Sequence, residues 1–245
     1  MPENNKRLVL IGGESGAGKS ASFHTVRDPE NMIYLNAEGK DLPFAHKFKA
    51  LNITDPLTIF QAFQEAENMP EVHSIGIDSL TFLMDMYESQ YVLRAKDTQK
   101  GWQNYQQYFK SLMHEYVARS TKTVVFTAHT AAVLNTDNHI MERKVSIKGA
   151  LKDRGVEAYF STIVAAKKMP LDLLEPYINP LLTITPHDER IGYKHVFQTQ
   201  LTKDTTNERI KANMGMWDFK ETYINNDVQI LLDRLNEYYG SAKAA

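Results

Sequence analysis

Residues Leu8–Ser20 read LVLIGGESGAGKS, and this stretch decides the fold. Its four opening apolar residues, Leu8 to Ile11, are typical of a strand buried on both faces at the centre of a parallel sheet. From Gly13 to Ser20 the residues then fit the pattern G-x-x-x-x-G-K-[ST] of a phosphate-binding loop. The strand–loop–helix context favours a nucleoside triphosphate site over the alternative, an ordinary glycine-rich turn.

The chemistry of this loop gives each part of it a role. Its glycines let successive backbone N–H groups face one phosphate, and the helix that begins at Gly18 adds the positive end of its dipole. Lys19 supplies a charge for the outer phosphates, and the Ser20 hydroxyl is placed to ligate Mg²⁺. The expected nucleotide-binding residues are Gly13, Glu14, Ser15, Gly16, Ala17, Gly18, Lys19, Ser20 and Ala21.

The composition is that of an ordinary globular protein. Of the 245 residues, 42% are hydrophobic and 24% are charged. The chain has no cysteine, which excludes disulfides, thiol catalysis and cysteine-bound zinc and fits a reducing cytoplasm. No apolar run approaches the roughly 18 residues of a membrane span, so we expect a cytoplasmic protein without a membrane partner. A net charge of −2 gives no overall attraction to nucleic acid, so any such binding must come from local basic patches.

Alternating strand and helix patterns predict one α/β domain over residues 1–245, with a mostly parallel sheet flanked by helices. Toward the C-terminus we expect antiparallel strands, because Leu181–Thr185 and Lys194–Leu201 flank a turn-like Asp188–Gly192. We expect a final helix to begin near Asn226. Further strands are predicted at residues 32–36, 72–77, 123–128 and 161–166, and helices at 19–26, from 55, from 80 and from 102.

Two carboxylates follow expected strands. Asp78 ends the apolar stretch from Val72 to Ile77, which places it at the carboxyl edge of the sheet, where it can hold Mg²⁺ through water. Glu38 follows Met32–Asn36 at the same edge, where it can orient or deprotonate the water that attacks the γ-phosphate. The alternative for Glu38 is a solvated loop glutamate.

The order of these motifs resembles a known family. Gly13–Ser20, Tyr34–Gly39, Ile77–Ser79 and Phe126–His129 together look like the ATPase core of the RecA-like recombinases. The whole chain is more similar still to the small phage ATP-binding proteins of the Sak single-strand-annealing group, a phage AAA-type ATPase family. The features shared with that group are Thr98–Trp102, Gly192–Thr199 and Gly215–Asp218.

The resemblance implies a RecA-like P-loop fold and further roles. Glu38 matches the glutamate that activates water, and together with Lys19 and the γ-phosphate sensor His129 it forms the implied catalytic set. The segment Thr130–Ile147 corresponds to the mobile DNA loop, which Lys148–Lys152 closes. Leu93–Tyr105 corresponds to the other DNA loop.

Basic and aromatic residues in these two segments support DNA binding on their own. Phosphate attraction combined with base stacking is the means by which proteins bind single strands. The candidate DNA-binding residues are Lys100, Trp102, Arg143, Lys144 and Lys148. For Trp102 the alternative is packing on the core, and for the lysines a solvated surface.

These observations predict an ATPase that uses ATP and Mg²⁺ and acts on single-stranded DNA in phage recombination or annealing. We expect a homo-oligomer, either a ring or a short filament, and a single-strand binding protein is a further candidate partner. The alternatives are a small-molecule P-loop kinase and a nucleotide-gated accessory or packaging module with little turnover.

Overall fold

A central sheet organises the computed structural model, which describes residues 4–136 and 139–241. Within these residues it has nine strands in the order β3-β2-β4-β5-β1-β7-β8-β9, with β6 paired to β5 outside this path. The strands are β1 Leu8–Gly13, β2 Met32–Asn36, β3 Lys49–Asn52, β4 Ser74–Asp78, β5 Thr123–Asn135, β6 Ile140–Val145, β7 Thr162–Pro170, β8 Tyr193–Gln198 and β9 Tyr223–Asn225.

Strand β1 lies in the middle of the sheet and pairs in parallel with β5 on one side and β7 on the other. The strands β3, β2, β4 and β5 are likewise parallel to one another, whereas β6 runs antiparallel to β5, and β8 runs antiparallel to both β7 and β9. Every residue of β1, β2 and β4 is buried, as expected for strands covered on both faces. The predicted mostly parallel α/β fold with antiparallel C-terminal strands is confirmed.

Helices cover the two faces of this sheet. The α-helices are α1 Thr58–Glu67, α2 Leu80–Tyr87, α3 Thr98–Ser111, α4 Leu151–Arg154, α5 Pro186–Ile191 and α6 Val228–Ser241. The short 3₁₀ and π segments are η1 Ser20–Thr25, η2 Pro29–Asn31, η3 Glu88–Val92, η4 Leu112–Tyr116, η5 Val117–Arg119, η6 Val156–Tyr159, η7 Leu171–Leu173, η8 Glu175–Tyr177 and η9 Phe219–Thr222. No helix in the described part of the chain is long and apolar enough to cross a membrane.

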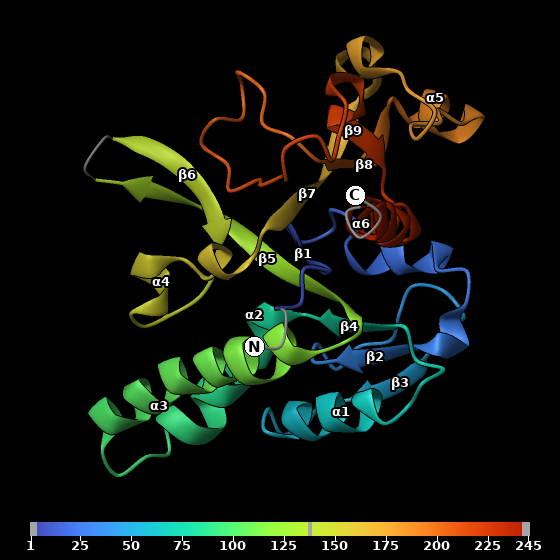
Figure 1. Ribbon diagram of the computed structural model, residues 1–245. Helices are drawn as coiled ribbons and strands as arrows, with labels where there is room; N and C mark the ends of the chain where they lie inside the picture. Colours follow the sequence, from blue (N-terminus) through green and yellow to red (C-terminus); the bar gives the residue numbers. More distant parts are fainter. Residues whose placement is uncertain (1–3, 137–138, 242–245) are drawn as a thin grey trace.

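Two hydrophobic clusters form the layers. Helices α1, α2 and α3 pack on one face of the sheet, where their apolar side chains surround Leu10, Ile75 and Phe126. On the other face, η1 and α6 pack around Ile11 and Phe197 (Figure 1). The segment that follows the phosphate loop therefore lies against the C-terminal helix.

The prediction of a hairpin turn at Asp188–Gly192 is wrong, because residues 188–191 belong to helix α5 and Gly192 is its C-cap. Thr185 and Asp188 form a capping box, in which the Thr185 side chain accepts from the Asp188 N–H, and Pro186 occupies the first turn. Gly192 ends the helix in a left-handed conformation with φ of 76°. No strand forms at Leu181–Thr185 among the described residues, and β8 pairs with β7 and β9 instead.

The two segments expected to be loops also fold differently. Strand β5 continues beyond Ala128 to Asn135 and pairs with β6, so most of Thr130–Ile147 is a β-hairpin that projects from the sheet (Figure 1). Residues 137–138 of this segment lie outside the described residues. Helix α3 begins at Thr98, where the Asp97 side chain accepts from the Lys100 N–H, so Leu93–Tyr105 is largely helical.

Candidate nucleotide-binding site

The phosphate-binding loop connects β1 to η1 and turns where its glycines lie. Gly16 has φ of 74° and Gly18 has φ of 95°, which are conformations that side chains other than glycine rarely adopt. The Ala17 N–H closes a turn on the Glu14 carbonyl at 3.2 Å. The helix expected at Lys19–Val26 is a 3₁₀ helix, Ser20–Thr25.

Lys19 lies inside this loop. Its side chain donates to the carbonyls of Gly13 at 3.0 Å and Glu14 at 2.9 Å, and only 5% of the residue is exposed. Burial lowers the pKa of Lys19, and the negative charges of Glu38 and Asp78 act in the opposite direction. A phosphate bound in the loop would therefore compete with these two carbonyls for hydrogen bonds from the ammonium group.

Asp78 is buried at the carboxyl end of β4. Its Oδ2 accepts from the Tyr34 hydroxyl at 2.5 Å, and its Oδ1 accepts from the Thr127 hydroxyl. Tyr34 is on β2 and Thr127 on β5, so both neighbours of β4 hold this carboxylate. Burial, and then the Asp78 charge, raises the pKa of Tyr34 far above its usual range, which keeps the phenol a hydrogen-bond donor.

The donor set at this edge fits magnesium. The Ser20 hydroxyl and the Asp78 carboxylate are oxygen ligands, and Mg²⁺ in nucleotide sites takes few protein ligands because water and phosphate oxygens supply the rest. No group of three or more His, Asp or Glu side chains suited to a metal occurs in the described residues. A magnesium ion here therefore depends on the nucleotide for its other ligands.

Glu38 is enclosed by two partners. Its Oε1 lies 3.0 Å from the His129 Nε2, its Oε2 is ion-paired with Lys40, and its side chain is 2% exposed. Burial opposes ionisation, but the hydrogen bonds from His129 and Lys40 outweigh it and lower the pKa of Glu38 to about 2. Glu38 is therefore an ionised, held carboxylate and not a solvated loop residue.

The backbone around Glu38 explains how it reaches His129. The Asn36 side-chain oxygen accepts from the N–H groups of Glu38 and Gly39, both at 3.1 Å, and the Ala37 N–H donates to the Asp78 carbonyl at 2.7 Å. These bonds fold the chain after β2 over the end of β4, toward β5. The structure thus places Lys19, Glu38, Asp78 and His129 at one edge of the sheet.

Two residues from the C-terminal part of the chain also contact the loop. His195 Nδ1 lies 3.0 Å from the Ala17 carbonyl oxygen, and the Asn226 side chain donates to the Gly18 carbonyl at 2.8 Å. The sequence reasoning did not find either one, and they are separated from the loop by 178 and 208 residues. The only sequence feature that pointed to either of them was the Gly192–Thr199 stretch shared with the Sak group, which contains His195.

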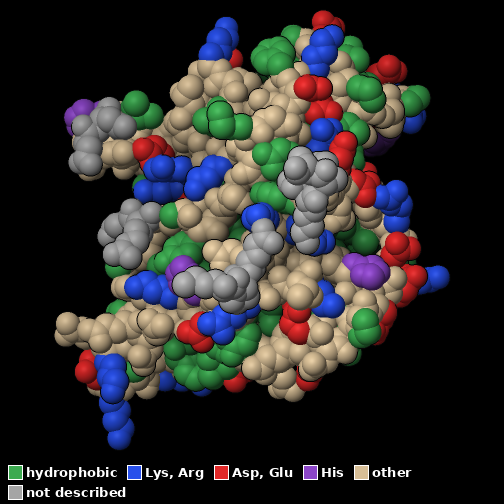
Figure 2. All heavy atoms as spheres, in the orientation of Figure 1, with side chains coloured by type: hydrophobic (Ala, Val, Ile, Leu, Met, Phe, Trp, Pro, Cys, Tyr) green, Lys and Arg blue, Asp and Glu red, His purple; other side chains and the backbone are tan. Residues whose placement is uncertain are grey.

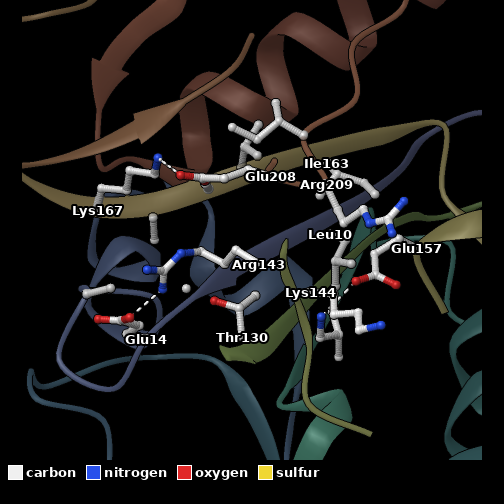
Figure 3. A pocket seen from close by; sticks show the side chains of 18 of the residues that line it. Leu10, Glu14, Thr130, Arg143, Lys144, Glu157, Ile163, Lys167, Glu208 and Arg209 are labelled. Carbon is white, nitrogen blue, oxygen red and sulfur yellow. Dashed lines mark hydrogen bonds and ion pairs between the residues drawn. The ribbon is translucent and has the colours of Figure 1, made fainter. Parts of the chain in front are cut away.

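A cavity of about 330 Å³ lies beside the loop, between residues 12–17, β6, β7 and residues 208–210. Arg143 reaches across it from β6 to an ion pair with Glu14, and Lys167 faces Glu208 at 2.5 Å (Figure 3). Neither Lys19, Glu38, Asp78 nor His129 lines this cavity. The cavity therefore shares residues 13–17 with the phosphate loop but does not include these four side chains.

The candidate DNA-binding residues lie in three places: on β6, on α3 and in the segment after β6. Arg143 and Lys144 lie on β6, in a region where Lys and Arg side chains gather in Figure 2. Lys100 is exposed on α3, and Trp102 packs against Tyr105, with ring centroids 5.3 Å apart, and is half-buried. Lys148 is paired with Glu88 at 2.7 Å.

Trp102 also packs against the segment that follows the hairpin. A Cβ added at Gly149 would lie 3.0 Å from its ring, so the backbone of Gly149 packs directly on the indole. In this structure the core-packing alternative describes Trp102 better than a free stacking surface, and its role on DNA stays a prediction.

No curated protein matches the sequence. Among solved structures, a crystal structure of the pilus retraction motor PilT with bound ADP is similar over 99% of this chain and 54% of that chain, with 14% identity and a TM-score of 0.34. The chain thus spans about half the length of that motor.

The family model described as an AAA domain matches residues 5–167, which include the phosphate loop, Glu38, Asp78 and His129. The chain therefore belongs to the AAA domain family of P-loop ATPases.

Proposed function

We propose that this protein is a Mg²⁺-dependent ATPase that binds single-stranded DNA through its β5–β6 hairpin and acts in phage recombination or annealing. The proposal joins the nucleotide chemistry of the family to the basic hairpin and to the resemblance to the Sak group.

In this proposal Lys19 and the loop N–H groups stabilise the phosphoryl group that is transferred. Ser20 and, through water, Asp78 hold Mg²⁺, which neutralises phosphate charge when it is bound. Glu38 orients the attacking water and accepts its proton, and His129 positions Glu38 and senses the γ-phosphate. The contact between Glu38 and His129 supports these roles, because it joins the two side chains at the phosphate edge.

One observation carries the link to DNA: Arg143, on the hairpin, is ion-paired with Glu14 of the phosphate loop. The same side chain thus lies at the nucleotide loop and on the surface proposed to meet the DNA backbone. A phosphate of the DNA backbone and the Glu14 carboxylate would compete for the Arg143 guanidinium. Binding of DNA to the hairpin therefore affects the phosphate loop, and binding at the phosphate loop affects the hairpin. Single-stranded DNA suits such a hairpin, because the basic side chains attract its phosphates without having to fit the groove of a duplex.

The proposed partners are single-stranded DNA, further copies of this chain in a ring or short filament, and a single-strand binding protein. Recombination or annealing needs several nucleotides of DNA held at once. Repetition of one small hairpin in an oligomer supplies such an extended basic surface.

The test is ATP hydrolysis measured with Mg²⁺ alone, with single-stranded DNA and with duplex DNA of the same sequence. We expect hydrolysis that single-stranded DNA stimulates more than duplex DNA does. Phosphate transfer to a small acceptor would favour the kinase alternative. Tight ATP binding without turnover, with or without DNA, would favour the nucleotide-gated module, and either result overturns the proposal.

A further inference from the structure

The outer side of the phosphate loop needs hydrogen-bond donors. A loop that turns its N–H groups toward a phosphate leaves carbonyl oxygens facing the protein, and buried carbonyls have to be paired. At Ala17 the donor is His195 Nδ1 of β8, at 3.0 Å. At Gly18 the Asn226 amide, 2.8 Å away, joins the Ser22 N–H, 3.0 Å away.

Close packing at this point explains the glycine. A Cβ at residue 18 would lie 2.7 Å from Asn226 Nδ2 and 3.0 Å from His195 Nδ1, in addition to the strain of its φ of 95°. Gly18 is therefore required by the residues behind the loop as well as by the loop's own turn.

The contacts continue along η1. The Thr25 hydroxyl donates to Asp227 at 2.5 Å, and the Arg27 N–H donates to the Gln229 side chain at 3.0 Å. The residues around the start of α6 thus hold both the loop and the 3₁₀ helix that follows it. A 3₁₀ helix has poorer internal hydrogen bonds than an α-helix, so outside support matters more here.

We propose that His195 and Asn226 are positioning residues that hold the phosphate loop in its nucleotide-binding conformation. Both residues lie beyond residues 5–167, which the AAA domain model matches, so the nucleotide site then extends past that match. This role of His195 and Asn226 rests on the nucleotide-binding part of the proposed function and does not depend on DNA binding. The His195 role needs a proton on Nδ1, which both the neutral Nδ1–H tautomer and the imidazolium provide.

The test is calorimetric titration of the full chain with MgADP, together with KM and kcat for ATP. His195→Phe keeps a ring without the donor, and Asn226→Asp puts an acceptor against the Gly18 carbonyl. We expect each to weaken MgADP binding by about tenfold, the scale of one lost hydrogen bond, and to raise KM by a similar factor. The kcat should change by less than about threefold, because the bound nucleotide restores the loop geometry.

His195→Asn is the rescue variant, since its amide can donate from nearly the position of Nδ1, and it should bind MgADP within about threefold of the parent. Asn225→Ala is the matched control: it removes a hydrogen bond between the Asn225 side chain and the Thr183 N–H, away from the loop. If Asn226→Asp does not fold, Asn226→Ala takes its place.

Parent-like MgADP affinity in both His195→Phe and the Asn226 variant would overturn the inference. An equal loss in Asn225→Ala would also overturn it, because the effect would then reflect general destabilisation. Absence of hydrolysis or of DNA binding would count against the proposed function alone, since MgADP binding is measured directly.

Discussion

Arg143 of the β5–β6 hairpin forms an ion pair with Glu14 of the phosphate loop, across 129 residues of sequence. The hydrogen bond and charge of Arg143 lower the pKa of Glu14, so this carboxylate is ionised at neutral pH. The pair is partly exposed, which limits its strength and makes it sensitive to salt. A partner with more negative charge, such as a DNA backbone, can therefore displace Glu14.

Replacing Glu14 by Gln releases Arg143 and should strengthen binding of single-stranded DNA in the absence of nucleotide. We expect a gain of about two- to fivefold at low salt, in keeping with the strength of an exposed ion pair. Fluorescence anisotropy of a labelled oligonucleotide measures it. In an Arg143→Ala background the same change should have no effect, and an equal gain there would show that the pair is not the cause.

The hairpin should account for most of the salt dependence of DNA binding. Arg143→Ala combined with Lys144→Ala is expected to flatten the slope of log K against log[salt] by roughly 1.4, at about 0.7 per phosphate contact on a single strand. Lys148→Ala is the comparison, because Lys148 is already paired with Glu88 and should change the slope less. A larger change from Lys148 than from the pair on β6 would place the DNA elsewhere.

Lys19→Ala should abolish binding or hydrolysis of ATP while the protein remains folded. The side chain donates to two loop carbonyls and is buried, so its loss removes local hydrogen bonds but leaves both hydrophobic clusters intact. We expect the free energy of unfolding to change by at most ~2 kcal/mol. Circular dichroism with urea titration checks the fold. Unchanged ATP turnover in the folded variant would contradict the assignment of the phosphate loop.

Glu38→Gln should leave ATP bound and slow turnover at least ~10²-fold, because the amide cannot accept the proton.

The Glu38→Gln variant also tests how the stability of the protein depends on pH. The pKa of Glu38 lies at about 2 in the fold, below its ordinary value of 4.5, so its contribution is present above pH 4.5 and is lost as the pH falls through 2. Urea midpoints of the parent and the variant should therefore differ most near neutral pH and converge on acidification.

Lys40→Met should make Glu38 a stronger base. Lys40 is one of two groups that lower the pKa of Glu38, and its own side chain is 63% exposed, so its removal disturbs little packing. We expect the acid limb of the pH profile of kcat/KM to move to higher pH, with kcat equal to or above that of the parent near neutral pH. An unmoved acid limb would mean that the Lys40 pair does not persist when ATP is bound.

Local patterns in the sequence were enough to predict which residues meet at the carboxyl edge of the sheet. Apolar runs identified β1, β2 and β4, and the residues that follow each of them, including Glu38 and Asp78, lie where the carboxyl ends of parallel strands must meet. The phosphate loop was predictable because its function depends on neighbouring backbone groups, which a short motif specifies.

Where local signals competed, the sequence reading failed. Polar residues at Asp188–Gly192 resembled a turn, yet the capping box and the adjacent proline build a helix there. The resemblance to the RecA-like ATPase core implied a mobile loop at Thr130–Ile147, but β5 and β6 pair into a hairpin whose β6 edge also receives residues 207–209.

Sequence alone determined the chemistry of the loop, because one motif carries the glycines, the lysine and the serine within eight residues. Only the tertiary structure decided what holds that chemistry in place. His195 and Asn226 behind the loop, Arg143 across from Glu14, and Lys40 and His129 around Glu38 each depend on an ionic contact or hydrogen bond set by the folded backbone. For most of them the partners are far apart in sequence, and no spacing rule links such residues, because folding brings them together.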